Sequence, residues 1–194
     1  MSKSDSSASK RERNKAIRWI VIIFTVTILV SGTISFVSDI IMSGSSMFVA
    51  FLILLAIVLF GVFADVVGLA VTAADEKPFH SMAARKVPGS IEALQLLRNA
   101  DRVSTICNDV IGDICGVVSG SASATIAVQI LQKFEFSMET VIPLLLSALV
   151  AGLTVAGKAA GKSFAINSST QIVSFAGSVI YFIGHLGDLF KRKK

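Results

Sequence analysis

The sequence predicts an all-α, polytopic helical membrane protein, and three observations support this prediction. The 194 residues are 53% hydrophobic and only 16% charged, whereas a soluble domain carries roughly 25% charged residues. The apolar residues gather in runs nearly free of charge, and about 20 such residues cross the hydrocarbon core of a bilayer as a helix. The basic residues lie between and beside these runs. We therefore expect the lipid bilayer to be the main partner of the chain and the cell membrane its location.

The N-terminal region predicts a tail followed by a transmembrane helix. Residues 1–15 are rich in serine and lysine, a composition typical of a disordered cytoplasmic tail. Residues 16–42 hold an uncharged run from Trp19 to Ser38, which is long enough to cross the membrane. Trp19 is expected at the cytoplasmic interface, where tryptophan is enriched.

Residues 47–190 predict the main membrane domain. Met47 to Ala74 is the second span and is interrupted only by Asp65. Val103 to Gln132 predicts the third span, and Thr140 to Gly157 the fourth.

The segment between the second and third spans, residues 75–102, is polar and predicts cytoplasmic helices. Within it, Ser90 to Arg98 reads as a short amphipathic helix, with Ser90 as its N-cap. Ile91, Leu94 and Leu97 follow a helical spacing and are expected on one apolar face.

The C-terminal region allows two interpretations. Residues 163–190 predict one or two interfacial or re-entrant helices that return to the cytoplasmic face. A fifth crossing is the alternative, because Gln171 to Gly184 is apolar enough to enter a membrane, but it would place the basic tail at residues 191–194 outside.

The positive charges set the expected orientation. With both termini cytoplasmic, every lysine and arginine except Lys133 lies inside or at the inner edge of the membrane, as the positive-inside rule requires. Charge placed beside the spans favours lipid headgroups, so we expect no nucleic-acid partner. The sequence shows no nucleophile-and-base arrangement and no phosphate loop, so we expect no enzymatic activity.

Four charged residues lie within or beside the apolar runs, namely Asp65, Asp109, Asp113 and Lys158. An isolated charge at the bilayer centre is costly and usually marks a functional site. Counted from the cytoplasmic edge, Asp65 and Asp113 both lie roughly 15 Å deep by helical rise. Asp109 precedes Asp113 by one helical turn, and Asn108 adds an amide oxygen. Because Mg²⁺ prefers oxygen ligands, we predict a metal site formed by Asp65, Asn108, Asp109 and Asp113.

The third span also carries glycines at helical spacing. Gly112, Gly116 and Gly120 repeat every fourth residue, a pattern that lets another helix approach closely. The pattern does not distinguish a helix of the same chain from one of a second copy.

Two stretches resemble a known transporter family. Residues 93–106 read Ala-Leu-Gln-Leu-Leu-Arg-Asn-Ala-Asp-Arg-Val-Ser-Thr-Ile, and residues 70–75 read Ala-Val-Thr-Ala-Ala-Asp. They resemble the connecting helix and the end of the first span in the transmembrane domain of the CNNM and CorB/CorC magnesium-transporter family. Asp109 and Asp113 keep the spacing of a paired asparagine in that family. The resemblance covers about residues 50–185 and implies a homodimer that binds Mg²⁺ within the membrane, with Na⁺ as the coupling ion. The like charges of Asp109 and Asp113, one turn apart, favour protonation of one carboxylate, so H⁺ is the alternative coupling ion.

The chain departs from the family pattern in three ways. An extra span precedes the family-like domain, and the sequence shows no counterpart of the regulatory CBS-pair domain, so a separate cytoplasmic regulatory protein is a candidate partner. Aspartates stand where the family has a serine and the paired asparagines. Lys158 stands where the resemblance places the family's glutamate.

These substitutions allow two functional readings. In the first, the chain is a divalent cation transporter with an intramembrane carboxylate site. Lys158 is then the counter-charge that pairs with the carboxylates when no ion is bound and leaves them when an ion binds. In the second, the chain is a non-transporting membrane scaffold or regulator in which Asp–Lys pairs are structural locks.

Overall fold

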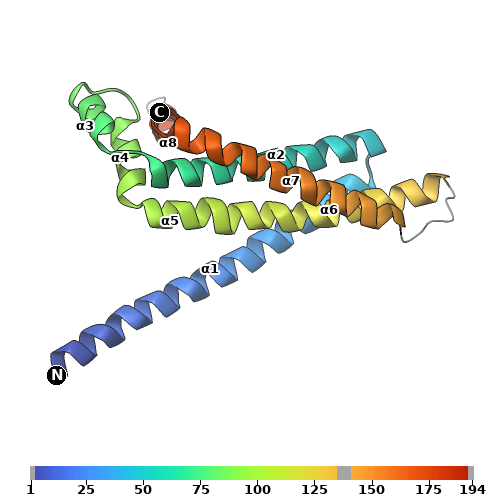
Figure 1. Cartoon of the computed structure of the whole chain (residues 1–194), viewed down its shortest axis with the longest axis horizontal. Helices are drawn as coiled ribbons and strands as arrows, with labels where there is room; N and C mark the ends of the chain where they lie inside the picture. Colours follow the sequence, from blue (N-terminus) through green and yellow to red (C-terminus); the bar gives the residue numbers. More distant parts are fainter. Residues whose placement is uncertain (1–2, 135–140, 192–194) are drawn as a thin grey trace.

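The computed structural model describes residues 3–134 and 141–191, and helices account for almost all of this part of the chain (Figure 1). This confirms the all-α prediction. In chain order the elements are α1 (Lys3–Ser43), α2 (Met47–Ala73), α3 (Lys77–Ala84), α4 (Ser90–Arg98), α5 (Ala100–Ser104), the π-helix η1 (Thr105–Gly112), α6 (Asp113–Phe134), α7 (Val141–Asn167) and α8 (Ser169–Lys191).

Within the described residues, four helical segments are long and apolar enough to cross a membrane. They are Ile17–Ser43 of α1, Met47–Ala73, the continuous run Ala100–Lys133 through α5, η1 and α6, and Val141–Asn167. The chain is therefore an integral, multi-pass membrane protein. Helices α2, α6 and α7 pack along one another (Figure 1). The C-terminal part of α1 contacts α6, whereas the N-terminal part of α1 diverges from the other helices.

The C-terminal end of α1 is held to α6 by two hydrogen bonds. The hydroxyl of Thr125 donates to Asp39 Oδ1 over 3.2 Å, and Gln129 Nε2 donates to the carbonyl oxygen of Met42 over 2.8 Å. The Met42 side chain is fully buried in an apolar cluster with Ile126 and other residues of α2, α6 and α7. Polar side chains and packing thus fix this end of the bundle, where α1 turns into α2.

Helices α3, α4 and α8 lie together at the opposite end of the bundle (Figure 1). Their core includes Phe79, Leu94 and Val173, packed beneath the last turns of α2. Gly89 has a φ of +82°, and the backbone of α8 passes so close that a β-carbon there would lie 2.5 Å from the nitrogen of Ser178. Only glycine combines this left-handed backbone with such close contact.

Helix α4 has the predicted bounds, but its start and its buried face differ from the prediction. The N-cap is Gly89, and the Ser90 hydroxyl donates to the carbonyl oxygen of Val87 over 2.6 Å. Leu94 and Leu97 are buried as predicted, whereas Ile91 is 61% exposed and Ala93 takes its place against α8. The buried face of α4 is the one that meets α8, and it includes Ala93 in place of Ile91. The spacing of apolar residues in α4 alone does not show where α8 lies.

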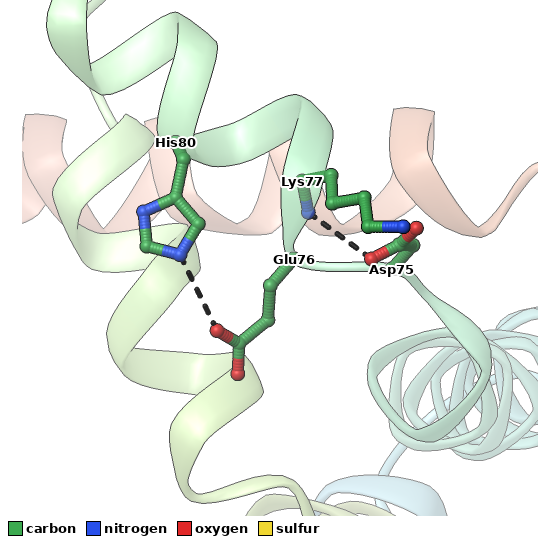
Figure 2. A network of polar contacts seen from close by, with 4 residues as sticks. All are labelled: Asp75, Glu76, Lys77 and His80. Carbon is green, nitrogen blue, oxygen red and sulfur yellow. Dashed lines mark hydrogen bonds and ion pairs between the residues drawn. The ribbon is translucent and has the colours of Figure 1, made fainter.

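The turn between α2 and α3 is stabilised by local polar contacts (Figure 2). Asp75 Oδ1 accepts a hydrogen bond from the backbone N–H of Lys77 over 3.1 Å, which supports the first turn of α3. One turn further on, the ring of His80 lies 3.5 Å from the Glu76 carboxylate. These residues shape a surface turn and take no part in the Asp65–Lys158 ion pair.

Two further regions differ from the prediction. Helix α1 begins at Lys3, so the residues expected to be a disordered tail continue the first span as a helix. Extending an existing helix needs no new nucleus, and Lys, Arg, Glu and Ala are good helix formers. Helix α7 continues to Asn167, and a turn then leads into α8. Residues 135–140 and 192–194, which include the predicted start of the fourth span at Thr140 and most of the basic tail, lie outside the described residues.

Candidate functional site

The centre of the candidate site is an ion pair between two membrane-spanning helices. Lys158 Nζ on α7 lies 3.0 Å from Asp65 Oδ2 on α2, and the two side chains are 30% and 13% exposed. In hydrocarbon, each charge would be costly alone, and pairing lowers that cost. The structure therefore joins one predicted ligand, Asp65, to the predicted counter-charge, Lys158.

Close packing of α7 on α2 positions Lys158 toward Asp65. Gly157 and Gly161 flank the lysine and lie against Val62 and Val66, where a β-carbon would approach the valine side chains to 3.0 Å and 2.6 Å. Residues four apart share a helix face, so both glycine contacts lie on the side of α7 that meets α2. Small residues at this spacing bring the two backbones close enough for Lys158 to reach the carboxylate.

A second helix contact, between α2 and the segment formed by η1 and the start of α6, also contains glycines that face larger side chains. We call this contact the seam. Cys115 lies over Gly61, and Asp65 Oδ1 lies over Gly112, each in the space that a β-carbon of the glycine would need. One turn further toward the end of the bundle that holds α3 and α4, the amide of Asn108 lies over Gly68 in the same way. The glycines thus make room for a thiol, a carboxylate and an amide along one line.

The π-helix η1 determines which residues of the third span face α2. Its i→i+5 hydrogen bonds hold more residues in each turn than an α-helix does, and such segments are frequent at functional sites. As a result, Asn108 and Gly112 face α2, whereas Asp109 and Asp113, the next residue in each case, are exposed. The carbonyl oxygen of Cys107 lies 3.5 Å from the position of a Gly112 β-carbon.

Two oxygen atoms in this seam are buried without a hydrogen-bond partner. They are Asp65 Oδ1 and Asn108 Oδ1. The Asn108 amide nitrogen donates to the Ser104 hydroxyl over 3.1 Å, which leaves the amide oxygen directed toward α2. A buried oxygen without a donor costs free energy, and such groups call for an explanation such as a bound water or ion.

The structure brings together only part of the predicted metal site within one chain. Asp65 of α2 faces η1, Asn108 of η1 faces α2, and Lys158 neutralises Asp65. Asp109 and Asp113 are exposed on the other side of the third span. Among residues 3–134 and 141–191, no three His, Cys, Asp or Glu side chains gather closely enough to hold a metal ion.

The predicted glycine repeat divides between two environments. Gly112 is buried against Asp65, with the ammonium of Lys158 3.4 Å from the position of its β-carbon. Gly116 and Gly120 are exposed, and nothing in the described chain lies within 4 Å of their β-carbon positions.

The sequence reasoning missed several residues that shape the site. Gly61 and Gly68 accommodate side chains of the third span, and Ser104 orients the Asn108 amide. Gly157 and Gly161, spaced by one turn around Lys158, offered a readable signal of close helix packing at that lysine.

Comparisons with known proteins add no relative to this description. No family model matches the chain, and no curated protein matches it.

Proposed function

We propose that this integral membrane protein is a divalent cation carrier, with Mg²⁺ as its expected substrate, and that Asp65 is its ion-binding group. One observation carries the proposal. Asp65 is paired with Lys158 inside the membrane, while its second carboxylate oxygen and the Asn108 amide oxygen are buried without partners. The magnesium-transporter resemblance of residues 93–106 supports the choice of ion, as does the preference of Mg²⁺ for oxygen ligands.

Lys158 supplies the switch in this mechanism. Its ammonium neutralises Asp65 when no ion is bound, so the empty carrier leaves no isolated carboxylate in the membrane. The lysine is 30% exposed and sits on a flexible four-carbon stem, so it can withdraw without unfolding α7. A cation then replaces the ammonium at Asp65 and contacts the oxygen of Asn108. Ion and lysine compete for one carboxylate.

A second function is favoured by the same ion pair. In a non-transporting scaffold or regulator, the Asp65–Lys158 pair would be a permanent lock between α2 and α7. Removal of the lysine has a different effect in each case. A carrier without its competitor binds cation more tightly, whereas a scaffold only loses stability.

The direct test is Mg²⁺ flux in proteoliposomes that contain the full chain, with Na⁺ and pH gradients applied in turn. Asp65→Asn should abolish flux, because the amide lacks the negative charge that attracts a divalent cation into the membrane. Asp113→Asn is the matched control, since Asp113 lies outside the seam, and it should retain flux. Absence of flux from folded wild-type protein under every gradient would favour the scaffold.

A further inference from the structure

An apolar cavity lies between α1, α2 and the third span, where α1 begins to diverge from the other helices (Figure 1). It has a volume of about 520 Å³ and is lined by apolar side chains and one thiol. Val30 and Ile34 contribute from α1, Ile57 and Phe60 from α2, and Ile114 from α6. This volume lies within the range of roughly 300–1,000 Å³ that is typical of ligand pockets. We call it the α1 cavity.

The α1 cavity is bounded at one end and approached from the other. On the side of the loop between α1 and α2, the hydrogen bonds of Asp39 with Thr125 and of Met42 with Gln129 hold α1 against α6. In the opposite direction α1 separates from the third span (Figure 1). A flexible apolar molecule therefore reaches the cavity from the end of the bundle at which α1 diverges.

Arg102 lies toward that end, over the ring of Trp19. Its guanidinium carbon is 5.6 Å from the centre of the indole ring, which is a cation–π distance. Tryptophan is enriched at the headgroup level of membranes. Ile111, which also lines the cavity, follows Arg102 by nine residues, or roughly 13 Å of helical rise. One leaflet of hydrocarbon is about 15 Å thick, so an acyl chain that starts at the level of Arg102 reaches the cavity.

A polar hollow beside Arg102 has the charge to receive a lipid headgroup. It has a volume of about 370 Å³, and its charged lining residues are Arg98, Asp101 and Arg102. Within the part of the chain that the structure describes, neither arginine forms an ion pair with a carboxylate. Two guanidinium groups outweigh one carboxylate, and basic pockets of this kind beside membrane helices bind anionic headgroups.

We infer that the polar hollow and the α1 cavity together bind one anionic phospholipid. Its phosphate lies between Arg98 and Arg102, because guanidinium groups donate paired hydrogen bonds to phosphate oxygens. One acyl chain fills the α1 cavity and contacts Ile114 and the facing side chains of α1. The chain supplies the packing that α1 lacks where it leaves the bundle.

The combination of the two sites selects a phospholipid over simpler occupants. A soluble phosphate matches the polar hollow but leaves the α1 cavity unfilled, and an uncharged apolar molecule does the reverse. Arg102 links the two sites, since it lines the hollow and also contacts α1 through Trp19. The lipid site is separate from the Asp65–Lys158 pair between α2 and α7, so it does not rest on the proposed carrier function.

The first test measures how lipid protects the full chain from thermal unfolding in detergent without Mg²⁺. Phosphatidylglycerol should raise the unfolding midpoint more than phosphatidylcholine, which has the same acyl chains and a phosphate but no net charge. Arg102→Gln should raise the half-saturating fraction of phosphatidylglycerol about fivefold. Arg85→Gln is the matched control, because Arg85 is exposed and lies outside the hollow, and it should leave that fraction unchanged.

Photo-cross-linking in liposomes locates the acyl chain. Phosphatidylglycerol with a diazirine near the end of one chain should label residues of the α1 cavity, which mass spectrometry identifies. Ala56→Phe and, from the α1 side, Ile34→Trp enlarge side chains that line the cavity, so each should reduce this labelling severalfold. Ala151→Phe is the control, since Ala151 is exposed on α7 and does not line the cavity, and it should retain the labelling.

Four results would overturn the inference. They are equal protection by phosphatidylglycerol and phosphatidylcholine, equal half-saturating fractions for Arg102→Gln and Arg85→Gln, labelling that neither cavity-filling variant reduces, and protection by inorganic phosphate that equals protection by phosphatidylglycerol. The last result would mean that the hollow binds a soluble anion alone.

Discussion

The carboxylate of Asp65 occupies the space that a side chain at Gly112 would need. A β-carbon on Gly112 would lie 2.5 Å from Asp65 Oδ1 and 3.4 Å from Lys158 Nζ. The ion pair between α2 and α7 is therefore also packed against the third span. Three membrane helices meet at one charged contact, and this relationship makes the site testable by small changes in side-chain volume.

Gly112→Ala should destabilise the fold although alanine favours helices over glycine by up to about 1 kcal/mol. The added methyl group must displace Asp65 and Lys158, and overpacking a tight contact costs typically about 1–3 kcal/mol. Thermal unfolding in detergent should show a lower midpoint. Gly116→Ala is the control, because its β-carbon position is open, and it should leave the midpoint unchanged or raise it. Equal effects of the two substitutions would contradict the packing described at Gly112.

Lys158→Met should lower the unfolding midpoint by leaving Asp65 unpaired. Because Lys158 is partly exposed, the loss should fall below the 3–5 kcal/mol of a fully buried pair, at roughly 2 kcal/mol. Lys162→Met, one turn further along α7 and exposed, should have little effect. The double variant Asp65→Asn with Lys158→Met should recover part of the loss. Identical midpoints for Lys158→Met and Lys162→Met would show that the ion pair contributes nothing to stability.

Substitutions at Asn108 and Ser104 distinguish the role of the Asn108 amide oxygen from the role of the hydrogen bond that orients the amide. Asn108→Ala removes one hydrogen bond but also removes a buried oxygen without a partner, so stability should change by less than about 1 kcal/mol. Its Mg²⁺-dependent thermal protection should weaken severalfold. Ser104→Ala removes the same hydrogen bond and keeps the oxygen, so it should retain that protection. The proposed ligand role of Asn108 fails if both variants are protected equally.

The sequence predicted the membrane spans well because length and apolar composition determine them directly. The second span begins at the predicted residue and ends one residue early, and α4 has the predicted bounds. The depth argument was also informative, since Asp65 lies opposite Gly112, directly beside Asp113 in the sequence. Level along a helix can be obtained by counting residues.

Counting residues could not predict which neighbouring helix each side chain of the third span faces. A spacing of four residues predicts that Asp109 and Asp113 share a face, but it does not say which helix that face meets. The π-helix η1 turns Asn108 and Gly112 toward α2 and leaves the two aspartates exposed. Nothing in the residues from Thr105 to Gly112 distinguishes i→i+5 from i→i+4 hydrogen bonding. The choice is made by tertiary packing.

The pairing of Lys158 was open at the level of sequence for a related reason. A lysine near the inner end of a span often extends to the interface. Its contact with Asp65 depends on how closely α7 approaches α2, and this is set by Gly157 and Gly161 against Val62 and Val66. The spacing of those glycines indicates close packing, but not the helix on which they pack.

The central claim is that Lys158 and a divalent cation compete for Asp65. Isothermal titration of Mg²⁺ into wild type, Lys158→Met and Asp65→Asn, each verified as folded by circular dichroism, tests it most directly. We predict tighter Mg²⁺ binding by Lys158→Met than by wild type, and no binding by Asp65→Asn. Binding of equal affinity by Asp65→Asn and wild type, or weaker binding by Lys158→Met, would contradict the claim.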